Sequence, residues 1–336
     1  MTRAPVVDPY VLAVERRRAG ARPPVPSDPV ARRRQALEQE HAAAALRPAR
    51  PPEVATLDVA VPVTGLPSTR LRVYWPSPER SSGPPAPALV YFYGGGFTIG
   101  SIDWPGWDTT YRHRAHESGV VVVAGEYGLA PEVRFPTQPE QCWSILEWTF
   151  AHAGELGIDP ARIAVGGASS GGNLAAAAAL MNRDRYDRPL RLQLLECPSL
   201  DLTMGHVHLD SMTSAIPSAI LRREGRRLID DYLGPDRRMA RNPYASPLLA
   251  RSLAGLPPAV VYTSEADPLR GDGEAWVTAL AAAGVPAVGV RYVGQTHTSG
   301  GFSQEVPAAD HLHGDIIRVL RGLHDEPAAY PDPRTS

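Results

Sequence analysis

The chain has 336 residues, a length that suits either one large domain with an appended part or two domains. Its 34 basic and 36 acidic residues leave a net charge of −2, which argues against a nucleic-acid-binding protein. All basic residues are arginine, so Schiff-base or pyridoxal-phosphate chemistry on a lysine and a Walker-type phosphate loop are excluded. The two cysteines, Cys142 and Cys197, are too few for a disulfide scaffold or a cysteine-rich zinc site.

Segments that would place the chain in or across a membrane are not visible in the sequence. No apolar run approaches the ~20 residues of a membrane-spanning helix. The first twenty residues lack the apolar stretch of a secretory signal. We therefore expect a cytoplasmic protein that interacts with neither membranes nor nucleic acid.

The first 55 residues differ in composition from the rest of the chain. Arginine clusters, proline breaks and an alanine run predict two short helices over 8–19 and 28–46. Asp28 and Pro29 suit the N-cap and first turn of the second helix. This region is either a solvated arm or a lid over a site.

From about residue 56, strands alternate with helices. The expected strands cover residues 57–63, 71–75, 88–93, 120–124, 162–165, 190–195, 259–263 and 287–292. The expected helices cover residues 106–118, 142–152, 172–181, 221–233, 273–283 and 309–323. Several strands are continuous apolar runs, which are typical of strands buried on both faces. The alternation predicts an α/β fold with a mostly parallel eight-stranded sheet and helices on both faces.

More than sixty residues separate the strands at 190–195 and 259–263, which exceeds a simple crossover. The segment 203–245 reads as an inserted subdomain near the carboxyl ends of the strands, where α/β proteins place their sites.

The most specific motif is Gly167-Ala168-Ser169-Ser170-Gly171, a G-x-S-x-G sequence between an expected strand and helix. That context is the one a nucleophile elbow requires, since a sharp turn there pushes the serine hydroxyl out of the sheet. The alternative is a glycine-rich turn with an incidental serine.

Three glycines, Gly94 to Gly96, follow the expected strand 88–93. Bare main-chain N–H groups at a strand end suit an oxyanion hole for acyl transfer. This assigns Gly94 and Gly95 as donors, with the N–H of Ser170 as the third. The alternative is a flexible glycine turn.

An acid and a histidine follow the serine in the order that an α/β-hydrolase needs. Asp267 lies just after strand 259–263, and His297 lies just after strand 287–292. We expect His297 to accept the Ser169 proton and Asp267 to orient the imidazole. The fallback residues are Glu265 as the acid and His311 or His313 as the base.

Together these motifs resemble the hormone-sensitive-lipase family of α/β-hydrolases, the bacterial carboxylesterases with a cap, over residues 57–322. The resemblance rests on collinear stretches at 93–101, 127–132, 135–136, 167–173, 246–248, 256–258 and 267–270. It implies an N-terminal helical part of a cap at 1–50 and an inserted cap segment at 201–245. The catalytic core then comprises 51–200 and 246–336, and the resemblance also implies a homodimer through the last strand and helix.

The chain departs from the family pattern near its motifs. Tyr93 replaces the histidine before the glycines, Ala168 replaces the acid before the serine, and Gly128 replaces an arginine. Residues 298–301 separate His297 from the Phe that the family places closer to it. These changes alter the residues that support the site.

The leading hypothesis is a serine hydrolase that cleaves a small or medium-chain ester through an acyl-enzyme. The alternatives are lactone opening, cyclisation or acyl transfer with the same nucleophile, and a non-catalytic binding protein on this fold. The candidate pocket residues are Tyr93, Trp104, Trp107, Met204, Met212 and Tyr232. The Tyr93 hydroxyl would either lie near the oxyanion hole or, in the favoured interpretation, only tie down the glycine loop. No group of histidines and carboxylates has ligand spacing along the chain, so no metal or cofactor is expected.

Overall fold

The computed structural model describes residues 5–19, 25–45, 50–80, 83–208, 218–303 and 305–327. Eight strands form one sheet: β1 Thr56–Val63, β2 Leu66–Tyr74, β3 Ala86–Phe92, β4 Val121–Gly125, β5 Ile158–Ala168, β6 Leu190–Glu196, β7 Ala259–Ala266 and β8 Ala287–Thr296. Their order across the sheet is β1-β2-β4-β3-β5-β6-β7-β8. Only the pairs β1–β2 and β2–β4 are antiparallel, so the expected eight-stranded, mostly parallel sheet is confirmed.

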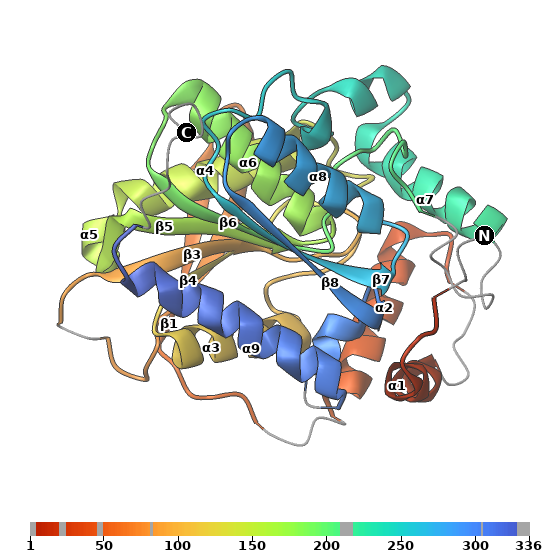
Figure 1. Cartoon of the computed structure of the whole chain (residues 1–336), viewed down its shortest axis with the longest axis horizontal. Helices are drawn as coiled ribbons and strands as arrows, with labels where there is room; N and C mark the ends of the chain where they lie inside the picture. Colours follow the sequence, from red (N-terminus) through yellow and green to blue (C-terminus); the bar gives the residue numbers. More distant parts are fainter. Residues whose placement is uncertain are drawn as a thin grey trace.

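Helices cover both faces of this sheet (Figure 1). On one face lie α4 Thr137–Ala151, α6 Ser170–Arg185 and α8 Arg270–Ala282, with the short α5 Ala153–Leu156 after α4. On the other face lie α3 Pro105–Ser118 and α9 Pro307–Arg321. The central strands are buried on both sides; β4 reads Val-Val-Val-Ala-Gly and is buried throughout. Because helices cover both faces of such a strand, none of its side chains contacts water, and this explains its uninterrupted apolar sequence.

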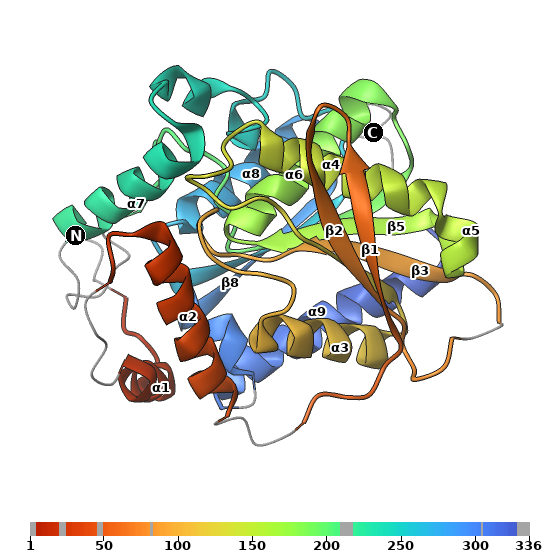
Figure 2. The same ribbon diagram turned by 180° about the vertical axis from the view of Figure 1, so that it is seen from behind.

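Three further helices lie toward the carboxyl ends of the parallel strands (Figure 2): α1 Pro9–Ala19, α2 Pro29–Ala44 and α7 Ser218–Leu233. The side chain of Asp28 accepts a hydrogen bond from Ala31 N at 2.7 Å, and Pro29 begins α2, as its sequence predicted. Arg33 on α2 donates to the carbonyls of Thr98 at 2.9 Å and Ala130 at 2.8 Å. The helix α2 is therefore attached to the loop that follows β3.

Most expected elements occur, and the differences lie at their ends. The helix α4 begins at Thr137, five residues before the expected Cys142. Its first turn contains Pro139. Proline is tolerated there, since the first N–H groups of a helix need no intrahelical partner. The strand β5 is also longer than expected, because Ile158 pairs with Ala86 across a register shift.

Candidate active site

Ser169 lies in the tight turn between β5 and α6. Its backbone has φ 53° and ψ −118°, a strained conformation for a residue with a side chain. The Ser169 N–H donates to the carbonyl of Glu196 at 2.9 Å, and its own carbonyl accepts from Ser199 N at 3.2 Å. These main-chain hydrogen bonds to residues at the end of β6 hold the turn in its strained conformation.

Gly171 shows why small residues surround the serine. A Cβ atom at this position would lie 2.1 Å from the carbonyl oxygen of Phe92 and 2.3 Å from that of Tyr93. Both obstacles are backbone atoms at the end of β3, so they cannot rotate away. The helix α6 therefore reaches the sheet closely enough to place its N-terminus beneath Ser169 only if Gly171 lacks a side chain.

His297 and Asp267 complete a chain of hydrogen bonds to the serine. The Nε2 atom of His297 lies 3.0 Å from Ser169 Oγ, and its Nδ1 atom lies 2.8 Å from Asp267 Oδ2. Asp267 is fully buried, and its other oxygen accepts from Leu269 N at 2.8 Å. The structure thus brings together the three residues that the sequence had spread over 128 positions.

Two opposing effects act on the pKa of His297. Burial of the ring lowers this pKa, and the Asp267 carboxylate raises it through charge and hydrogen bonding. The net effect is a pKa above the ordinary value of 6.5. The Asp267 carboxylate thereby stabilises the imidazolium that forms when His297 accepts a proton.

The glycine loop after β3 lies against the serine. A Cβ atom at Gly94 would lie 3.3 Å from Ser169 Cβ, which shows how near the two segments are. Gly95 has φ 147°, and its carbonyl accepts from Thr98 N and Ile99 N, both at 3.1 Å. Among the described residues no acceptor binds the N–H of Gly94 or Gly95. Ser170 is the first residue of α6, so its N–H also has no intrahelical partner.

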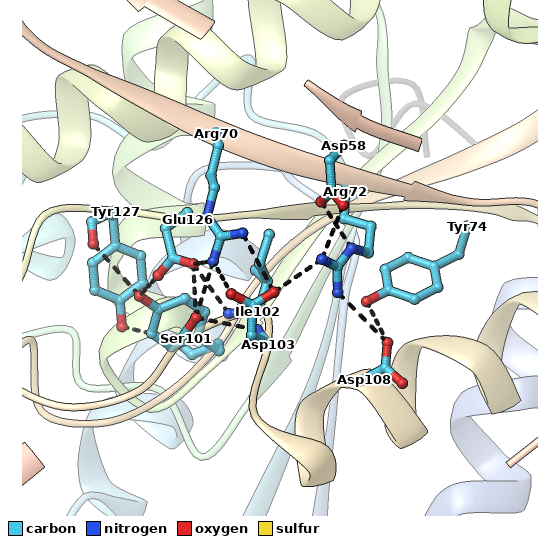
Figure 3. A network of polar contacts seen from close by, with 11 residues as sticks. Asp58, Arg70, Arg72, Tyr74, Ser101, Ile102, Asp103, Asp108, Glu126 and Tyr127 are labelled. Atoms are coloured by element: carbon cyan, nitrogen blue, oxygen red, sulfur yellow. Dashed lines mark hydrogen bonds and ion pairs between the residues drawn. The ribbon is translucent and has the colours of Figure 1, made fainter. Parts of the chain in front are cut away.

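Glu126, directly after β4, anchors the glycine loop through hydrogen bonds to its carboxylate (Figure 3). Its carboxylate accepts from Tyr93 Oη and, at 3.0 Å, from Ser101 Oγ. It also accepts from Ile102 N at 3.2 Å and pairs with Arg70 on β2 at 3.0 Å. One carboxylate therefore ties both ends of the glycine loop to the hairpin β1–β2. Sequence reasoning missed Glu126, although an acid directly after a buried strand was a signal.

The candidate pocket residues occupy different environments. Tyr93 is fully buried and its hydroxyl donates to Glu126, so of the two roles considered for this hydroxyl the structure supports the one that ties down the glycine loop, and not a substrate contact. Tyr232 is also fully buried, with its ring stacked 3.8 Å from that of Phe97, which makes it a packing residue of the same loop. Trp107 packs among Tyr91, Tyr93 and Tyr111.

Of the other three pocket candidates, two lie among the described residues. Trp104 precedes α3 and is partly exposed. Met204 has φ 63° and follows Asp201, whose carbonyl accepts its N–H at 3.1 Å. Met212 lies outside the described residues.

The loop of His297 is attached to the N-terminal helix. The hydroxyl of Thr296 donates to Glu15 Oε1 at 2.6 Å, and Asp8 N donates to Gly294 O at 2.8 Å. A small apolar cluster joins α1 to the segments around His297: Val7, Val11, Val14, Ala266, Phe302, Val306 and Ala309. The sequence carried no signal for this contact, because Glu15 and Thr296 are 281 residues apart.

Cys197 lies beside the acid of the site. Its sulfur is 3.4 Å from Ser264 Oγ and within 4.8 Å of ligand atoms of Asp267 and His297. Burial and the nearby Asp267 carboxylate raise the pKa of the thiol well above 9.0. A protonated thiol is a poor metal ligand and a poor nucleophile, so Cys197 acts here as a neutral neighbour of Asp267.

Comparisons with known proteins agree with this geometry. A family model described as the alpha/beta hydrolase fold matches residues 89–300. The carboxylesterase NlhH of Mycobacterium tuberculosis (strain ATCC 25618 / H37Rv) is 36% identical over 280 residues, which cover 81% of this chain and 84% of that protein.

Solved structures extend the similarity over almost the whole chain. The thermophilic carboxylesterase EstE1, cloned from a metagenomic library, is 36% identical with a TM-score of 0.76, covering 89% of this chain and 99% of that one. A bacterial heroin esterase is 31% identical with a TM-score of 0.81, covering 96% and 99%. Among the described residues, no helix is both long enough and apolar enough to span a bilayer.

Proposed function

The chain belongs to the hormone-sensitive-lipase-like family of α/β hydrolases and is a carboxylic ester hydrolase; we propose that it cleaves small or medium-chain esters through an acyl-enzyme on Ser169. The family expected from the motifs is confirmed by these matches. One observation carries the mechanism: His297 bridges Ser169 Oγ at 3.0 Å and Asp267 Oδ2 at 2.8 Å. A nucleophile, a base within hydrogen-bond reach and an orienting acid are the parts that acyl transfer needs.

In the first half of the reaction, Ser169 Oγ attacks the carbonyl carbon of the ester while His297 Nε2 accepts its proton. The carbonyl oxygen becomes an oxyanion next to the N–H groups of Gly94, Gly95 and Ser170. Because these donors have no other acceptor within the described part of the chain, they stabilise the developing charge without first breaking a hydrogen bond. The imidazolium then passes its proton to the leaving alkoxide, and the alcohol departs.

In the second half, water attacks the acyl group on Ser169 and gives a proton to His297. The tetrahedral intermediate uses the same oxyanion donors and collapses to the free acid. Ser169 regains its proton from His297, which restores the starting state. Asp267 remains ionised throughout and holds Nδ1 as the protonated nitrogen.

We assign residues 1–50 and 201–245 to a cap over this site. Two contacts support the assignment: Arg33 on α2 bonds the glycine loop through Thr98 O, and Tyr232 on α7 stacks on Phe97 of the same loop. The helices α2 and α7 also meet through Arg32 and Asp231 at 3.7 Å. A cap of this kind limits the length of acyl chain that reaches Ser169.

Hydrolysis of p-nitrophenyl acetate, butyrate and octanoate by the wild type and by Ser169→Ala tests the proposal. We expect turnover by the wild type, highest on the shorter esters, and a loss of roughly 10⁴-fold or more in kcat for the variant. The exposed Ser252→Ala is the matched control and should behave as the wild type. Retained activity in Ser169→Ala would refute the acyl-enzyme.

The acyl acceptor is tested separately with the same esters in the presence of methanol. Hydrolysis predicts that free acid remains the main product, because water is the acceptor. A product mixture dominated by methyl ester would instead indicate an acyltransferase that uses the same nucleophile.

A further inference from the structure

Three side chains of metal-ligand type lie together on the face of the sheet that α3 and α9 cover. His113 and Glu117 are four residues apart on α3, so they project from the same side of that helix. His313 comes from α9, which lies beside α3 (Figure 1). None of the three takes part in the hydrogen bonds around Ser169.

The two histidines converge on one carboxylate. His113 Nδ1 lies 2.7 Å from Glu117 Oε1, and His313 Nε2 lies 2.9 Å from Glu117 Oε2. One ligand atom from each residue lies within 4.8 Å of the other two. The imidazole rings are perpendicular, with centroids 6.0 Å apart, so they approach the carboxylate from different directions.

The hydrogen bonding of this group is incomplete. The second ring nitrogen of His113, Nε2, is buried and has no partner among the described residues. Between 23% and 33% of each of the three side chains is exposed, so a small hydrated ion can reach them. The adjacent Arg321 donates to the main-chain carbonyl of Glu117 at 3.0 Å and leaves the carboxylate to the histidines.

We propose that His113, Glu117 and His313 form a binding site for a divalent transition-metal ion such as Zn²⁺, which cross-links α3 to α9. Two imidazole nitrogens and one carboxylate oxygen are ligands that zinc accepts, with water as the fourth. Metal–ligand bonds of about 2.0–2.1 Å place tetrahedral ligand atoms about 3.3 Å apart. The two hydrogen-bonded spacings, 2.7 and 2.9 Å, need to widen by about half an ångström. They involve different oxygens of Glu117, so the carboxylate must also turn to offer one oxygen to an ion held by both rings.

Proton balance on binding follows from the ligands. Each histidine presents a lone pair at the nitrogen that now faces Glu117, so its proton there moves to the other ring nitrogen or leaves to solvent. Glu117 offers a carboxylate oxygen to each ring nitrogen. No oxidant or further reactant is required.

The place of the site in the fold indicates what the ion does. The helix α3 follows the glycine loop, and α9 follows the loop of His297. An ion between them joins the segments behind both loops without touching the reacting atoms. We therefore expect stabilisation of the fold and an unchanged chemical step, whatever ester the enzyme cleaves.

The test uses tag-free, full-length enzyme freed of metal with EDTA, titrated with Zn²⁺ by calorimetry. The expected result is one Zn²⁺ per chain with a Kd below about 10 µM. The midpoint of thermal unfolding should rise by about 5 °C when free Zn²⁺ exceeds the Kd a hundredfold. Co²⁺ in place of Zn²⁺ should give the visible absorption of a tetrahedral site.

Variants assign the binding to this group. His113→Ala and His313→Ala should each weaken Zn²⁺ binding by ~100-fold, and Glu117→Gln by at least ~10-fold. Glu117→Gln keeps a hydrogen-bond acceptor for the rings, so it decides the question even if an alanine variant is unstable. The matched controls are His116→Ala and His311→Ala, exposed histidines on the same two helices.

Two results would overturn the proposal. One is the absence of Zn²⁺ binding to the wild type in this concentration range. The other is unchanged Zn²⁺ binding in Glu117→Gln and in the folded alanine variants. If Zn²⁺ then also inhibits ester hydrolysis, the ion binds instead at Cys197, Asp267 and His297. Circular dichroism and thermal unfolding of every metal-free variant report folding and keep this test independent of the proposed reaction.

Discussion

Ser169 and His297 are joined by one hydrogen bond, yet different parts of the molecule hold the loops that carry them. Ser169 follows β5, a central strand paired with β3 and β6, and main-chain bonds to Glu196 and Ser199 fix its turn. His297 follows β8, the edge strand, which pairs only with β7. Its loop is held by side chains and by the N-terminal helix, through Glu15 and the apolar cluster around Val11.

The two loops are therefore constrained in different ways, which we call the serine side (the turn of Ser169) and the histidine side (the loop of His297). The position of the nucleophile follows from backbone geometry in consecutive residues, where a wrong side chain cannot be accommodated. The position of the base depends on several side-chain contacts with a distant segment. Loss of one of these contacts leaves the others in place, so the base is displaced only slightly. Changes on the serine side should therefore have larger effects than changes on the histidine side.

Among substitutions of residues that hold the two loops in place, the largest effect is expected for Gly171→Ala. The new Cβ atom meets the carbonyl oxygens of Phe92 and Tyr93 at 2.1 and 2.3 Å, so α6 must move away from the sheet. A displacement of this kind should lower kcat/KM at least ~100-fold and also lower the unfolding temperature. Steady-state kinetics and thermal unfolding measure both.

Gly154→Ala is its matched control, because a Cβ atom there would meet nothing within 4 Å. This variant should retain wild-type rates. Near-normal activity in Gly171→Ala would contradict the backbone constraint that distinguishes the serine side.

The pH dependence reports on the histidine side. His297 must be neutral to accept the Ser169 proton, and its pKa lies above 6.5. As pH falls through that pKa, kcat/KM should decrease about tenfold per unit. The stability from the charged pair with Asp267 has the opposite sense: it is fully present below the unfolded pKa and is lost as pH rises through the folded one.

The measurement is a pH profile of kcat/KM on p-nitrophenyl acetate, followed at the isosbestic wavelength of the product. His206→Gln is the control, since His206 bonds Asp201 rather than the triad, and its profile should match the wild type. An acidic limb with its midpoint below 6.5 would be inconsistent with the Asp267–His297 pair described above.

The smallest effect is expected for Glu15→Ala, which removes the 2.6 Å hydrogen bond to Thr296. We expect kcat to fall by about tenfold, because the base is displaced while the nucleophile is not. Glu38→Ala on α2, an exposed carboxylate, is the control and should be neutral.

A double-mutant cycle with Thr296→Val sharpens this test. If the two residues act through one bond, the double variant should be no slower than the slower single variant. Strictly additive losses would show that Glu15 does not act through the His297 loop.

The sequence alone was sufficient for much of the fold and for the order of the candidate triad. The continuous apolar strands and their alternation with helices predicted the eight-stranded sheet, because burial on both faces imposes that composition. The G-x-S-x-G pattern located the turn of Ser169, since only small residues permit the approach of α6 to β3. Asp267 and His297 were placed by chain order at the same edge of the sheet.

The contacts that hold the site residues in place could not be predicted from the sequence. The partner of the Tyr93 hydroxyl, Glu126, could not be predicted, because it lies at the end of a neighbouring strand. Ligand spacing along the chain could not reveal that His313 approaches Glu117, because the two lie 196 residues apart. Periodicity and spacing describe neighbours along the chain and cannot report which strand ends or helix faces meet.

Sequence by itself therefore determined the local structures: a buried parallel sheet, a glycine-flanked serine and a glycine loop with free N–H groups. These follow from burial, chirality and steric exclusion over a few consecutive residues. Only the tertiary structure decided that Glu126 holds the glycine loop, that Glu15 holds the loop of His297, and that α3 and α9 bring two histidines to Glu117. Each of these contacts joins residues far apart in the chain, and their meeting depends on how the whole sheet and its helices pack.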